Sequence, residues 1–395
     1  MHKLKIIIHD YSGHPFQVQL SRELATRGHE VTHLYSKNFQ TPRGKLVKSE
    51  HDAPTLDIVG VSLKEAFQKN TFLKRRNQEI EYGQRVADII KEIKPDIVVS
   101  SNSPLDAQWH IQRASQDIGA QFIFWLQDIY SEAISRILPS KIPVLGHAIG
   151  AFYKLLEFKM LKSSDAIVSI TEDFKTILAH ENVVADKIHV IENWAPLDEI
   201  VPISPDNDWA KAHMAEGEIK IVYSGTLGLK HNPDLLLNLA ENLPNAVVYV
   251  FSEGEAANYL KSKAQSKGVS NLKMASWVAF EDLSAMLSGA DIFVAMIEKE
   301  AGQYCVPSKV LSYFCVGRPI LAAIPKGNLA QRLIENQEAG LVAEPDNISA
   351  LIECAKKLST DKALREKMGR NGTDYAQKHF NITAIADKFE TIFKL

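Results

Sequence analysis

Residues 305–319 (CVPSKVLSYFCVGRP) contain a short, proline-broken loop that runs into the first turn of a helix. Pro307 and Ser308 suit a helix start, and the backbone N–H groups of that turn have no partner inside the helix. Such groups can hold an anion such as a phosphate. Pro307, Ser308 and Lys309 are therefore candidate phosphate-binding residues. From this segment alone, a capped helix in an ordinary α/β domain is the more frequent interpretation.

A glycine-bearing turn near the N-terminus is a second candidate ligand site. Residues 9–16 (HDYSGHPF) follow a short apolar run and lead into a helix that is expected over 17–28. Gly13 lets the backbone approach a ligand closely, and Ser12 or His14 can hydrogen-bond a phosphate or a sugar hydroxyl. The alternative is structural, with Ser12 as a helix cap and His14 as a solvated turn residue.

Residues 224–233 (SGTLGLKHNP) occupy the corresponding place in the C-terminal half. Two glycines and a lysine after a strand resemble phosphate-binding turns, although they match neither GxxxxGK[ST] nor a full GxGxxG. Lys230 can neutralise a pyrophosphate as a point charge. The alternative is a solvated lysine near a helix start.

Asp128 is the best candidate for an acid, a base or a sugar-orienting group. It lies in FWLQDIY (124–130), directly after an apolar run that is expected to form a buried strand. In parallel sheets ligands collect beyond the carboxyl ends of the strands, where Asp128 is expected. Glu132 is a second candidate on the same loop. An aspartate after a strand is also frequently a helix N-cap, and the sequence leaves both roles open.

Short β-branched runs alternate with longer amphipathic stretches, which is the pattern of parallel strands covered by helices. Two series of strands are expected, at 5–8, 30–35, 96–100, 121–126, 166–170 and 188–191, and at 219–225, 246–252, 272–276, 291–297 and 319–324. Residues 193–209 are rich in Pro, Asp and Asn and indicate an interdomain linker. We therefore expect an α/β fold with two Rossmann-like domains that face each other across a cleft.

Composition narrows the class of protein. The length of 395 residues indicates two domains, and the net charge of −3 gives no reason to expect nucleic acid as a partner. The three cysteines form no CxxC pair and no cluster at metal-ligand spacing. The N-terminal apolar run is too short for a signal peptide, and no stretch reaches the ~20 apolar residues that span a bilayer. A reducing cytoplasm is the expected location, with membrane contact at most peripheral.

The chain carries an ordered set of recognisable blocks. They are GHEVT (28–32), KPDIVVSS (94–101), FWLQDIY (124–130), SDAIVSITEDFKTIL (164–178), KIHVIENW (187–194), IVYSGTLGLKHNPDLLL (221–237), FSEGEAANYL (251–260), SGADIFVAMI (288–297) and VPSKVLSYFCVGRPILA (306–322). Together they resemble the retaining, nucleotide-sugar-dependent glycosyltransferases of the GT-B fold, in the large family four that builds bacterial surface polysaccharides. The resemblance implies an acceptor-binding domain over 1–195, a nucleotide-sugar-binding domain over 196–375 and a C-terminal helix over 376–395 that crosses back to the N-terminal domain.

The resemblance assigns donor binding mainly to the C-terminal domain. It places the diphosphate near the turn of Lys230, where many relatives have arginine at the position of Thr226. Gly254 stands where a glycine turn approaches the nucleotide, and the base is expected to pack near 276–283. The N-terminal glycine loop is expected to close on the donor phosphate or the acceptor. The donor-binding residues so implied are Ser12, Gly13, His14, Gly225, Thr226, Gly254, Val278, Pro307, Ser308, Lys309 and Ser312.

One feature of the family, the glutamate pair E-x7-E, is absent. Counting back from Gly317 puts Tyr304 at the first position and Ser312 at the second. Ser312 can hydrogen-bond a ribose hydroxyl, although not as an anion. Glu298 and Glu300 either substitute for the missing acids or form a solvated edge. The chain is most similar to relatives that keep PSK-x4-Y/F-x-x-G-R/K-P without this pair and act on lipid-linked or polysaccharide acceptors.

The implied activity is transfer of a hexose-type sugar from a nucleotide diphosphate sugar, UDP-linked in our interpretation, to a hydroxyl of a glycan or a polyprenyl-diphosphate-linked glycan, with retention. Asp128 and Lys230 are the expected catalytic residues. No metal is expected, because the one DxD-like match, at 206–208, lies in the linker, and no cofactor is expected beyond the nucleotide sugar as co-substrate. Two alternatives remain: a sugar-nucleotide epimerase of the same fold, and a non-catalytic sugar-nucleotide-binding partner.

Two stretches combine apolar and cationic residues at helical spacing, at 69–78 and at 142–162. A basic amphipathic helix can rest on anionic lipid, whereas such helices more frequently cover a domain core. With an acceptor carried on polyprenyl diphosphate, the N-terminal domain is expected at the inner face of the plasma membrane. The final segment, 380–395, is expected to form an amphipathic helix.

Overall fold

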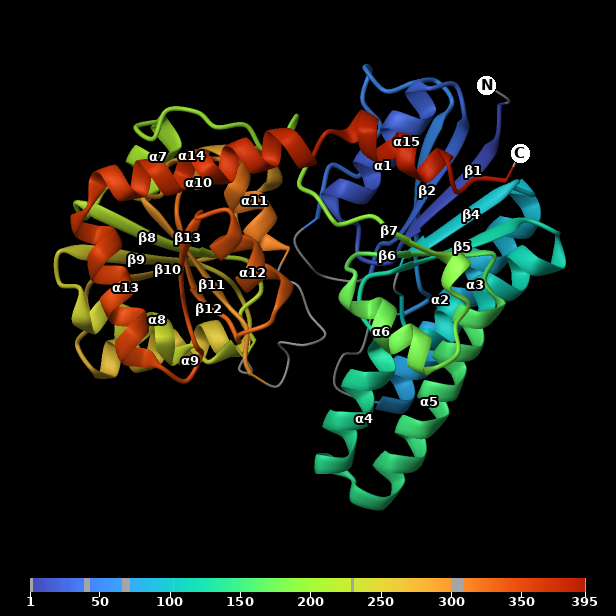
Figure 1. Cartoon of the computed structure of the whole chain (residues 1–395), viewed down its shortest axis with the longest axis horizontal. Helices are drawn as coiled ribbons and strands as arrows, with labels where there is room; N and C mark the ends of the chain where they lie inside the picture. Colours follow the sequence, from blue (N-terminus) through green and yellow to red (C-terminus); the bar gives the residue numbers. More distant parts are fainter. Residues whose placement is uncertain are drawn as a thin grey trace. The chain divides into compact units, whose positions relative to one another are not determined.

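The computed structural model describes residues 3–38, 43–65, 72–101, 103–228, 231–299 and 308–394. Its contacts divide the chain into two compact units (Figure 1). Unit 1 comprises Met1–Asn193 and Ile382–Leu395, and unit 2 comprises Trp194–Asn381. The boundaries expected from the sequence were at 195/196 and 375/376.

The described part of unit 1 contains a seven-stranded parallel sheet in the order β3-β2-β1-β4-β5-β6-β7. Its strands are β1 (Lys5–Asp10), β2 (Glu30–Ser36), β3 (Leu56–Val61), β4 (Ile97–Ser101), β5 (Gln121–Leu126), β6 (Ala166–Ser169) and β7 (Ile188–Val190). Its helices are α1 (Pro15–Thr26), α2 (Phe72–Ile93), α3 (Leu105–Asp117), α4 (Tyr130–Lys141), α5 (Pro143–Ser163), α6 (Asp173–His180) and α15 (Ile382–Glu390). Strands and helices alternate through most of the unit, as the sequence pattern predicts, but β3 follows β2 and α5 follows α4 directly in the order of described elements.

The central strands of unit 1 are apolar on both faces because helices cover both sides of a parallel sheet. Ile6, Ile7 and Ile8 of β1 are fully buried. β1 lies between β2 and β4, and its Ile7 pairs with Thr32 on one side and Val98 on the other. The strand order changes direction between β1 and β4. The loops after these two strands therefore border the crevice at which sheets of this kind bind ligands.

The described part of unit 2 contains a six-stranded parallel sheet in the order β10-β9-β8-β11-β12-β13. Its strands are β8 (Ile219–Ser224), β9 (Ala246–Phe251), β10 (Leu272–Ala275), β11 (Ile292–Met296), β12 (Ile320–Ala323) and β13 (Gly340–Ala343). Its helices are α7 (Asp208–His213), α8 (Asp234–Asn242), α9 (Glu255–Ser266), α10 (Leu283–Ser288), α11 (Lys309–Cys315), α12 (Leu329–Asn336), α13 (Ile348–Thr360) and α14 (Lys362–His379). The corresponding change of direction lies between β8 and β11.

The structure differs from the sequence-based expectations mainly at element ends. The edge strands β3 and β13 were not expected, because Asp57 and Gly60 interrupt the run of β3 and the run of β13 has only four residues. Helix α1 begins at Pro15, since proline suits the first helical position. The expected linker contains the start of α7, where Oδ1 of Asn207 accepts a hydrogen bond from the N–H of Ala210 at 2.9 Å. The DxD-like match at 206–208 is thus part of a helix cap.

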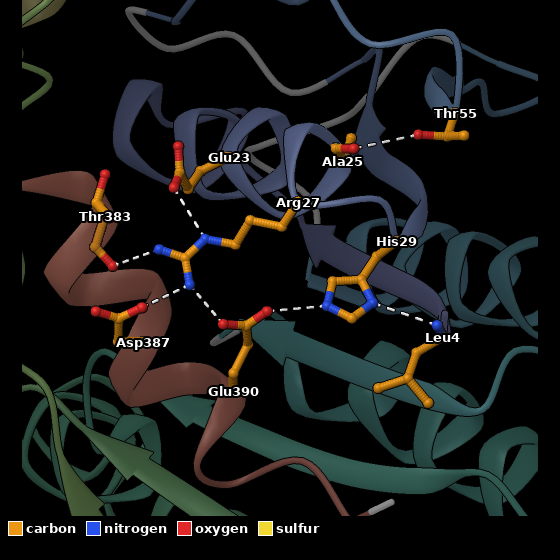
Figure 2. Close-up of polar contacts among 9 residues, drawn as sticks. All are labelled: Leu4, Glu23, Ala25, Arg27, His29, Thr55, Thr383, Asp387 and Glu390. Carbon is orange, nitrogen blue, oxygen red and sulfur yellow. Dashed lines mark hydrogen bonds and ion pairs between the residues drawn. The ribbon is translucent and has the colours of Figure 1, made fainter. Parts of the chain in front are cut away.

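The C-terminal segment is divided between the two units. α14 ends at His379 and α15 begins at Ile382, so no single helix spans 380–395. Figure 2 shows how α15 is held in unit 1: the Arg27 guanidinium donates to Asp387 at 2.7 Å, to Glu390 and to the carbonyl of Thr383. Phe389 also packs edge-on against the buried Trp125, with ring centroids 4.9 Å apart.

Candidate functional site

The loop after β1 is organised around the buried carboxylate of Asp10. Asp10 is the last residue of β1, and its side chain is 1% exposed. It accepts hydrogen bonds from the backbone N–H of Ser12 at 3.1 Å and from the backbone N–H of His14. A further contact joins it to Nδ1 of His14 at 3.2 Å. Two of the residues expected to bind ligand are therefore fixed by a carboxylate beneath them.

Asp10 and His14 shift each other's pKa. Burial acts to raise the pKa of Asp10, but the charge and hydrogen bonds of His14 outweigh burial, so this pKa lies below its usual value. Burial acts to lower the pKa of His14, but the charge of Asp10, their hydrogen bond and the charge of Asp128 together raise this pKa above its usual value. The loop therefore holds a carboxylate and an imidazole that stabilise each other's charged forms.

This arrangement determines what the loop after β1 can bind. The backbone N–H groups of Ser12 and His14 already donate to Asp10, so they are not available to a phosphate. Gly13 has a φ of +80°, and a Cβ there would lie 2.6 Å from Leu46. The His14 side chain is 38% exposed, and its Nε2 has no hydrogen-bond partner among the described residues. Because the buried carboxylate of Asp10 offsets the charge of the imidazole above it, the loop suits a hydroxyl better than an anion.

A buried network of hydrogen bonds lies next to this loop, at the ends of β1 and β4. Nδ1 of His9 lies 2.8 Å from Oγ of Ser100 in β4, and Nε2 lies 3.0 Å from the hydroxyl of Tyr82 in α2. The hydroxyls of Ser100 and Ser103 each donate to Oε1 of Gln108 at 2.7 Å. Burial lowers the pKa of His9 to about 3, so its ring is neutral. The network ties the end of β1 to the end of β4 at the point where the strand order changes direction.

Asp128 follows β5, at the same edge of the sheet as the loop after β1. Its charge contributes to the raised pKa of His14, so the structure brings these two candidates near each other. The first N–H groups of α4 are bound from elsewhere, because the carboxylate of Glu157 accepts from Tyr130 at 3.0 Å and from Ser131 at 2.9 Å. Burial raises the pKa of Glu157 to about 7, although these hydrogen bonds act to lower it. The N-cap role that the sequence leaves open for Asp128 thus belongs to Glu157.

Lys309 covers the glycine turn after β8. Gly225 has a φ of +119°, and its N–H donates to the carbonyl of Phe251 at 3.1 Å. Cε and Nζ of Lys309, the first residue of α11, lie 3.6 Å from the position that a Cβ on Gly225 would occupy. The same Nζ lies 3.7 Å from the ring centroid of Tyr223, which is a cation–π contact. Positive charge therefore stands directly at the turn.

Aromatic contacts fix α11, and with it Lys309, relative to β8. The hydroxyl of Tyr313 in α11 accepts a hydrogen bond from the N–H of Ser224 at 3.3 Å. The Tyr313 ring stacks on Phe293 of β11 with centroids 4.0 Å apart. The hydroxyl of Tyr223 donates to the carbonyl of Thr226 at 2.8 Å, which holds the turn itself. The sequence predicted Gly225, Thr226 and Lys309 as donor residues but gave no signal for the tyrosines that position them.

The other donor candidates follow strands of the same sheet. Gly254 follows β9 and precedes α9, with a φ of +102° and no atom within 4 Å of an added Cβ. Val278 follows β10 and is half-buried. Ser308 is exposed at the start of α11, and Ser312 is half-buried within it. Because parallel strands have their carboxyl ends at one edge, these residues lie on the edge that carries Gly225.

Several candidates lie outside the described residues: Lys230, Glu300, Tyr304 and Pro307. Glu298 is described and half-buried after β11. Within the described ranges, no group of three or more His, Cys, Asp or Glu side chains is placed to hold a metal ion. In the same part of the chain, no helix is long and apolar enough to cross a membrane.

Solved structures with this fold cover the whole chain. The sucrose-phosphate synthase of Thermosynechococcus elongatus has a TM-score of 0.76 at 15% identity, over 99% of this chain and 98% of that one. HepE of Anabaena, solved in complex with UDP and glucose, has a TM-score of 0.71 at 15% identity, over 99% of this chain and 100% of HepE. The two parallel-sheet units are therefore the two Rossmann-like domains of the GT-B fold, and the expected α/β fold with two such domains is confirmed.

Family models match both units. Residues 16–199 match Glycosyltransferase Family 4, and residues 206–375 match Glycosyl transferases group 1. This chain belongs to the GT-B glycosyltransferases. The Family 4 match covers most of unit 1 of this glycosyltransferase and includes Asp128, whereas Asp10 and His14 of the same unit precede the matched residues. Unit 2 is its group 1 domain, which carries Gly225 and Lys309.

The curated relatives of this glycosyltransferase are distant. WcaI of Escherichia coli strain K12, whose name assigns it to colanic acid biosynthesis as a glycosyl transferase, is 20% identical over 266 residues, 66% of this chain and 65% of WcaI. WbjE of Pseudomonas aeruginosa, also named as a glycosyltransferase, is 20% identical over 260 residues, 65% of this chain and 64% of WbjE. The matched region spans about two thirds of the length of these relatives.

Sequence reasoning overlooked two acidic residues of the site. Asp10 was passed over although its spacing of four residues from His14 is that of a local carboxylate–imidazole pair. Glu157 had no readable signal, because its partners at the start of α4 lie more than twenty residues away in the chain. Both carboxylates act on their neighbours from buried positions.

Proposed function

We propose that this GT-B glycosyltransferase moves a hexose-type sugar from a UDP-linked donor to a hydroxyl of a glycan or lipid-linked glycan, in the assembly of a cell-surface polysaccharide. The name of WcaI supports the polysaccharide, and UDP and glucose in HepE support the donor class. The observation that carries the proposal is the lysine over the glycine turn after β8, because the leaving group of this reaction is an anionic nucleoside diphosphate.

In this proposal the turn after β8 receives the donor diphosphate. Gly225 has no side chain in the way, and the Nζ of Lys309 supplies positive charge beside its backbone. Lys230 adds a second charge from the same turn. Ser308 and Ser312 bind hydroxyl or phosphate oxygens as neutral donors, and the nucleoside packs along the ends of β9 and β10, near Gly254 and Val278.

The acceptor hydroxyl is assigned to the edge of unit 1 that carries His14 and Asp128. With Nδ1 held by Asp10, Nε2 of His14 is the ring nitrogen that meets a hydroxyl. Asp128 orients the reacting sugar or takes up a proton during transfer. The half-exposed imidazole and the buried carboxylate beneath it fit a polar, uncharged group.

The chemistry follows from these assignments. The bond between the anomeric carbon and the diphosphate oxygen breaks, and the acceptor oxygen forms the new bond as it loses its proton. Lys230 and Lys309 stabilise the negative charge that develops on the leaving phosphate, without a metal ion. We propose that the anomeric configuration of the sugar is retained, because the acceptor attacks the face from which the diphosphate departs. We also propose that the enzyme acts at the inner face of the plasma membrane.

A donor panel tests the function. We expect UDP-linked hexoses to raise the melting temperature more than GDP- or TDP-linked sugars, and sugar to appear on a glycan acceptor. Conversion of the free nucleotide sugar without acceptor would instead identify an epimerase. Binding without turnover, for every donor and acceptor in the panel, would identify a non-catalytic partner. The absence of the E-x7-E glutamate pair is the observation that favours this alternative.

A further inference from the structure

Helices α4 and α5 of unit 1 form a hairpin that extends away from the sheet of that unit (Figure 1). Glycines allow the two helices to pack closely. A Cβ on Gly146 would lie 2.7 Å from backbone atoms of Leu138, and a Cβ on Gly150 would lie 3.0 Å from the side chain of Ser135. The hydrogen bonds of Glu157 to the start of α4 join the helices at their base. The two helices of the hairpin therefore pack against each other through a defined face.

The outer face of this hairpin is apolar. Its exposed large side chains are Ile142, Val144, Leu145, Phe152 and Leu155, with Val144 88% and Leu155 75% exposed. No other stretch of this length among the described residues exposes as many. Along α5 the spacing of Val144, Phe152 and Leu155 puts them on one side of the helix, whereas Gly146, Gly150 and Tyr153 are buried on the other.

Two hollows border this face. One, of about 780 Å³, is lined by Ala151, Leu155, Phe158 and Ser163 together with Lys154, Lys159, Lys162 and Glu181. Lys154 is ion-paired with Glu181 at 2.8 Å. The other, of about 380 Å³, lies by Ala148, Ile149 and Phe152 with Arg76 at its edge. Arg76 is ion-paired with Asp106. The positive charge beside these apolar walls that has no ion pair among the described residues therefore comes from Lys159 and Lys162, which suits an amphiphile with an acidic head group.

The charge of the hairpin is opposite to that of the whole chain. No Asp or Glu occurs between Glu132 and Glu157, although the chain carries a net charge of −3. Lys159 and Lys162 are exposed on α5, toward the base of the hairpin from Leu155, and the Nζ of Lys159 lies 4.9 Å from the ring centroid of Trp109. Apolar side chains thus dominate the distal part of α5, and lysines follow nearer the sheet.

We propose that the α4–α5 hairpin docks on an anionic bilayer surface, with Val144, Phe152 and Leu155 among the upper acyl chains and with Lys159 and Lys162 at the lipid phosphates. Helices with an apolar face and cationic flanks bind at this depth of the interface. A second copy of the chain fits less well, because Lys159 and Lys162 of two hairpins would repel each other. For the link to a lipid-linked acceptor this rests on the proposed function: a hairpin docked on the bilayer would hold the enzyme at the membrane that carries such an acceptor.

Vesicle sedimentation of the full chain, without donor or acceptor, tests this inference. We expect binding to vesicles of phosphatidylglycerol mixed with phosphatidylcholine, and little binding to phosphatidylcholine alone. The double variant Val144→Glu with Leu155→Glu should weaken binding about a hundredfold, since two apolar side chains lose their burial in lipid. Lys159→Gln with Lys162→Gln should weaken it about thirtyfold and reduce its salt dependence. The matched control is Val47→Glu, which alters a 70% exposed side chain of unit 1 outside the hairpin.

Absence of binding to the mixed vesicles, or equal binding by the parent chain and the Val144/Leu155 variant, would overturn the inference. Self-association in sedimentation equilibrium that the same variant abolishes, without vesicle binding, would assign the face to a second copy instead. Transfer to a water-soluble acceptor separates this test from that of the proposed function. We expect the Val144/Leu155 variant to retain such transfer while it loses vesicle binding.

Discussion

The turns after β1 and β8 occupy the same place in their respective sheets but differ in charge, with a carboxylate–imidazole pair after β1 and a lysine after β8. After β1, the buried Asp10 binds the loop's own N–H groups and holds His14. After β8, Lys309 lies over Tyr223 beside the backbone of Gly225. The point at which the strand order changes direction indicates where each sheet binds a ligand. The charged side chains next to the turn decide which charge that ligand can carry. The β8 turn suits a diphosphate, and the β1 loop suits a hydroxyl.

Removal of the positive charge at the β8 turn should have the largest effect. We expect Lys230→Ala with Lys309→Ala to lower kcat/KM about a thousandfold, because the developing charge on the leaving phosphate loses both lysines. Lys309→Arg should retain most activity, since it keeps the charge. Lys267→Ala is the matched control, because it removes an ion-paired lysine at the end of α9. Initial rates of transfer with excess acceptor measure the effect, and a loss below tenfold would contradict the assignment.

The acceptor side should respond next. We expect Asp128→Ala to lower kcat about a hundredfold while donor affinity stays within a few-fold of the parent, because Asp128 acts on the acceptor and not on the diphosphate. Asp117→Ala, at the end of α3, controls for loss of a carboxylate from unit 1. Steady-state kinetics with separate variation of donor and acceptor make the measurement. If the substitution raised only the KM of the donor, the assignment of Asp128 to the acceptor site would be wrong.

The Asp10–His14 pair should appear in the pH profile. The pKa of His14 is raised in the folded state, so the pair stabilises the fold fully below about pH 6.5, and this contribution is lost as the pH rises through the folded value. His14→Gln should therefore flatten the fall in unfolding free energy from pH 6 to 8. Asp10→Asn removes the charge that raises the pKa of His14, so a step in kcat that depends on His14 should move to lower pH, and kcat itself should fall about tenfold at most. Asp128 also faces His14 and is kept intact in both variants. Profiles that superimpose on the parent would contradict the pairing.

The smallest effect is expected from an added methyl group at the β8 turn. Gly225→Ala and Gly28→Ala both place alanine at a positive φ, +119° and +98°, so each should lower the free energy of unfolding by about 1–2 kcal/mol. A Cβ on Gly225 also meets Lys309, whereas one on Gly28 meets no atom within 4 Å. We expect a few-fold loss of UDP affinity in Gly225→Ala alone. Denaturant unfolding first shows that both variants are folded and equally destabilised. Equal UDP affinity in the two variants would then contradict the assignment of UDP to the backbone of Gly225.

Much of the fold could be predicted from the sequence. The continuous apolar runs at 5–8, 96–100 and 121–126 are central strands buried on both faces, and this burial makes their pattern easy to read. The edge strand β3 was missed because Asp57 and Gly60 interrupt its apolar run, and β13 because it has only four residues, whereas the edge strands β7 and β10 were predicted. The break between α14 and α15 was missed because an amphipathic pattern continues through 380–395, while tertiary contacts of Arg27 and Phe389 decide where α15 sits.

The site was less predictable for a physical reason. Residue type indicated which turns carry glycine, lysine or histidine, and parallel topology placed them at one edge. The direction of the N–H groups of Ser12 and His14 depends on Asp10, which the sequence pattern marks only as the end of a strand. Likewise, Glu157 takes the cap of α4 through a contact between two helices. Buried carboxylates that act on other segments leave no local pattern.

Calorimetric titration of UDP into three proteins tests the central comparison most directly. The parent chain, Lys309→Ala and His14→Ala differ only at the two turns, and both substitutions change half-buried or half-exposed side chains. We expect Lys309→Ala to weaken UDP binding about a hundredfold, because a charge-assisted phosphate contact is lost, and His14→Ala to leave UDP binding unchanged. Loss of UDP affinity in His14→Ala, with affinity retained in Lys309→Ala, would contradict it.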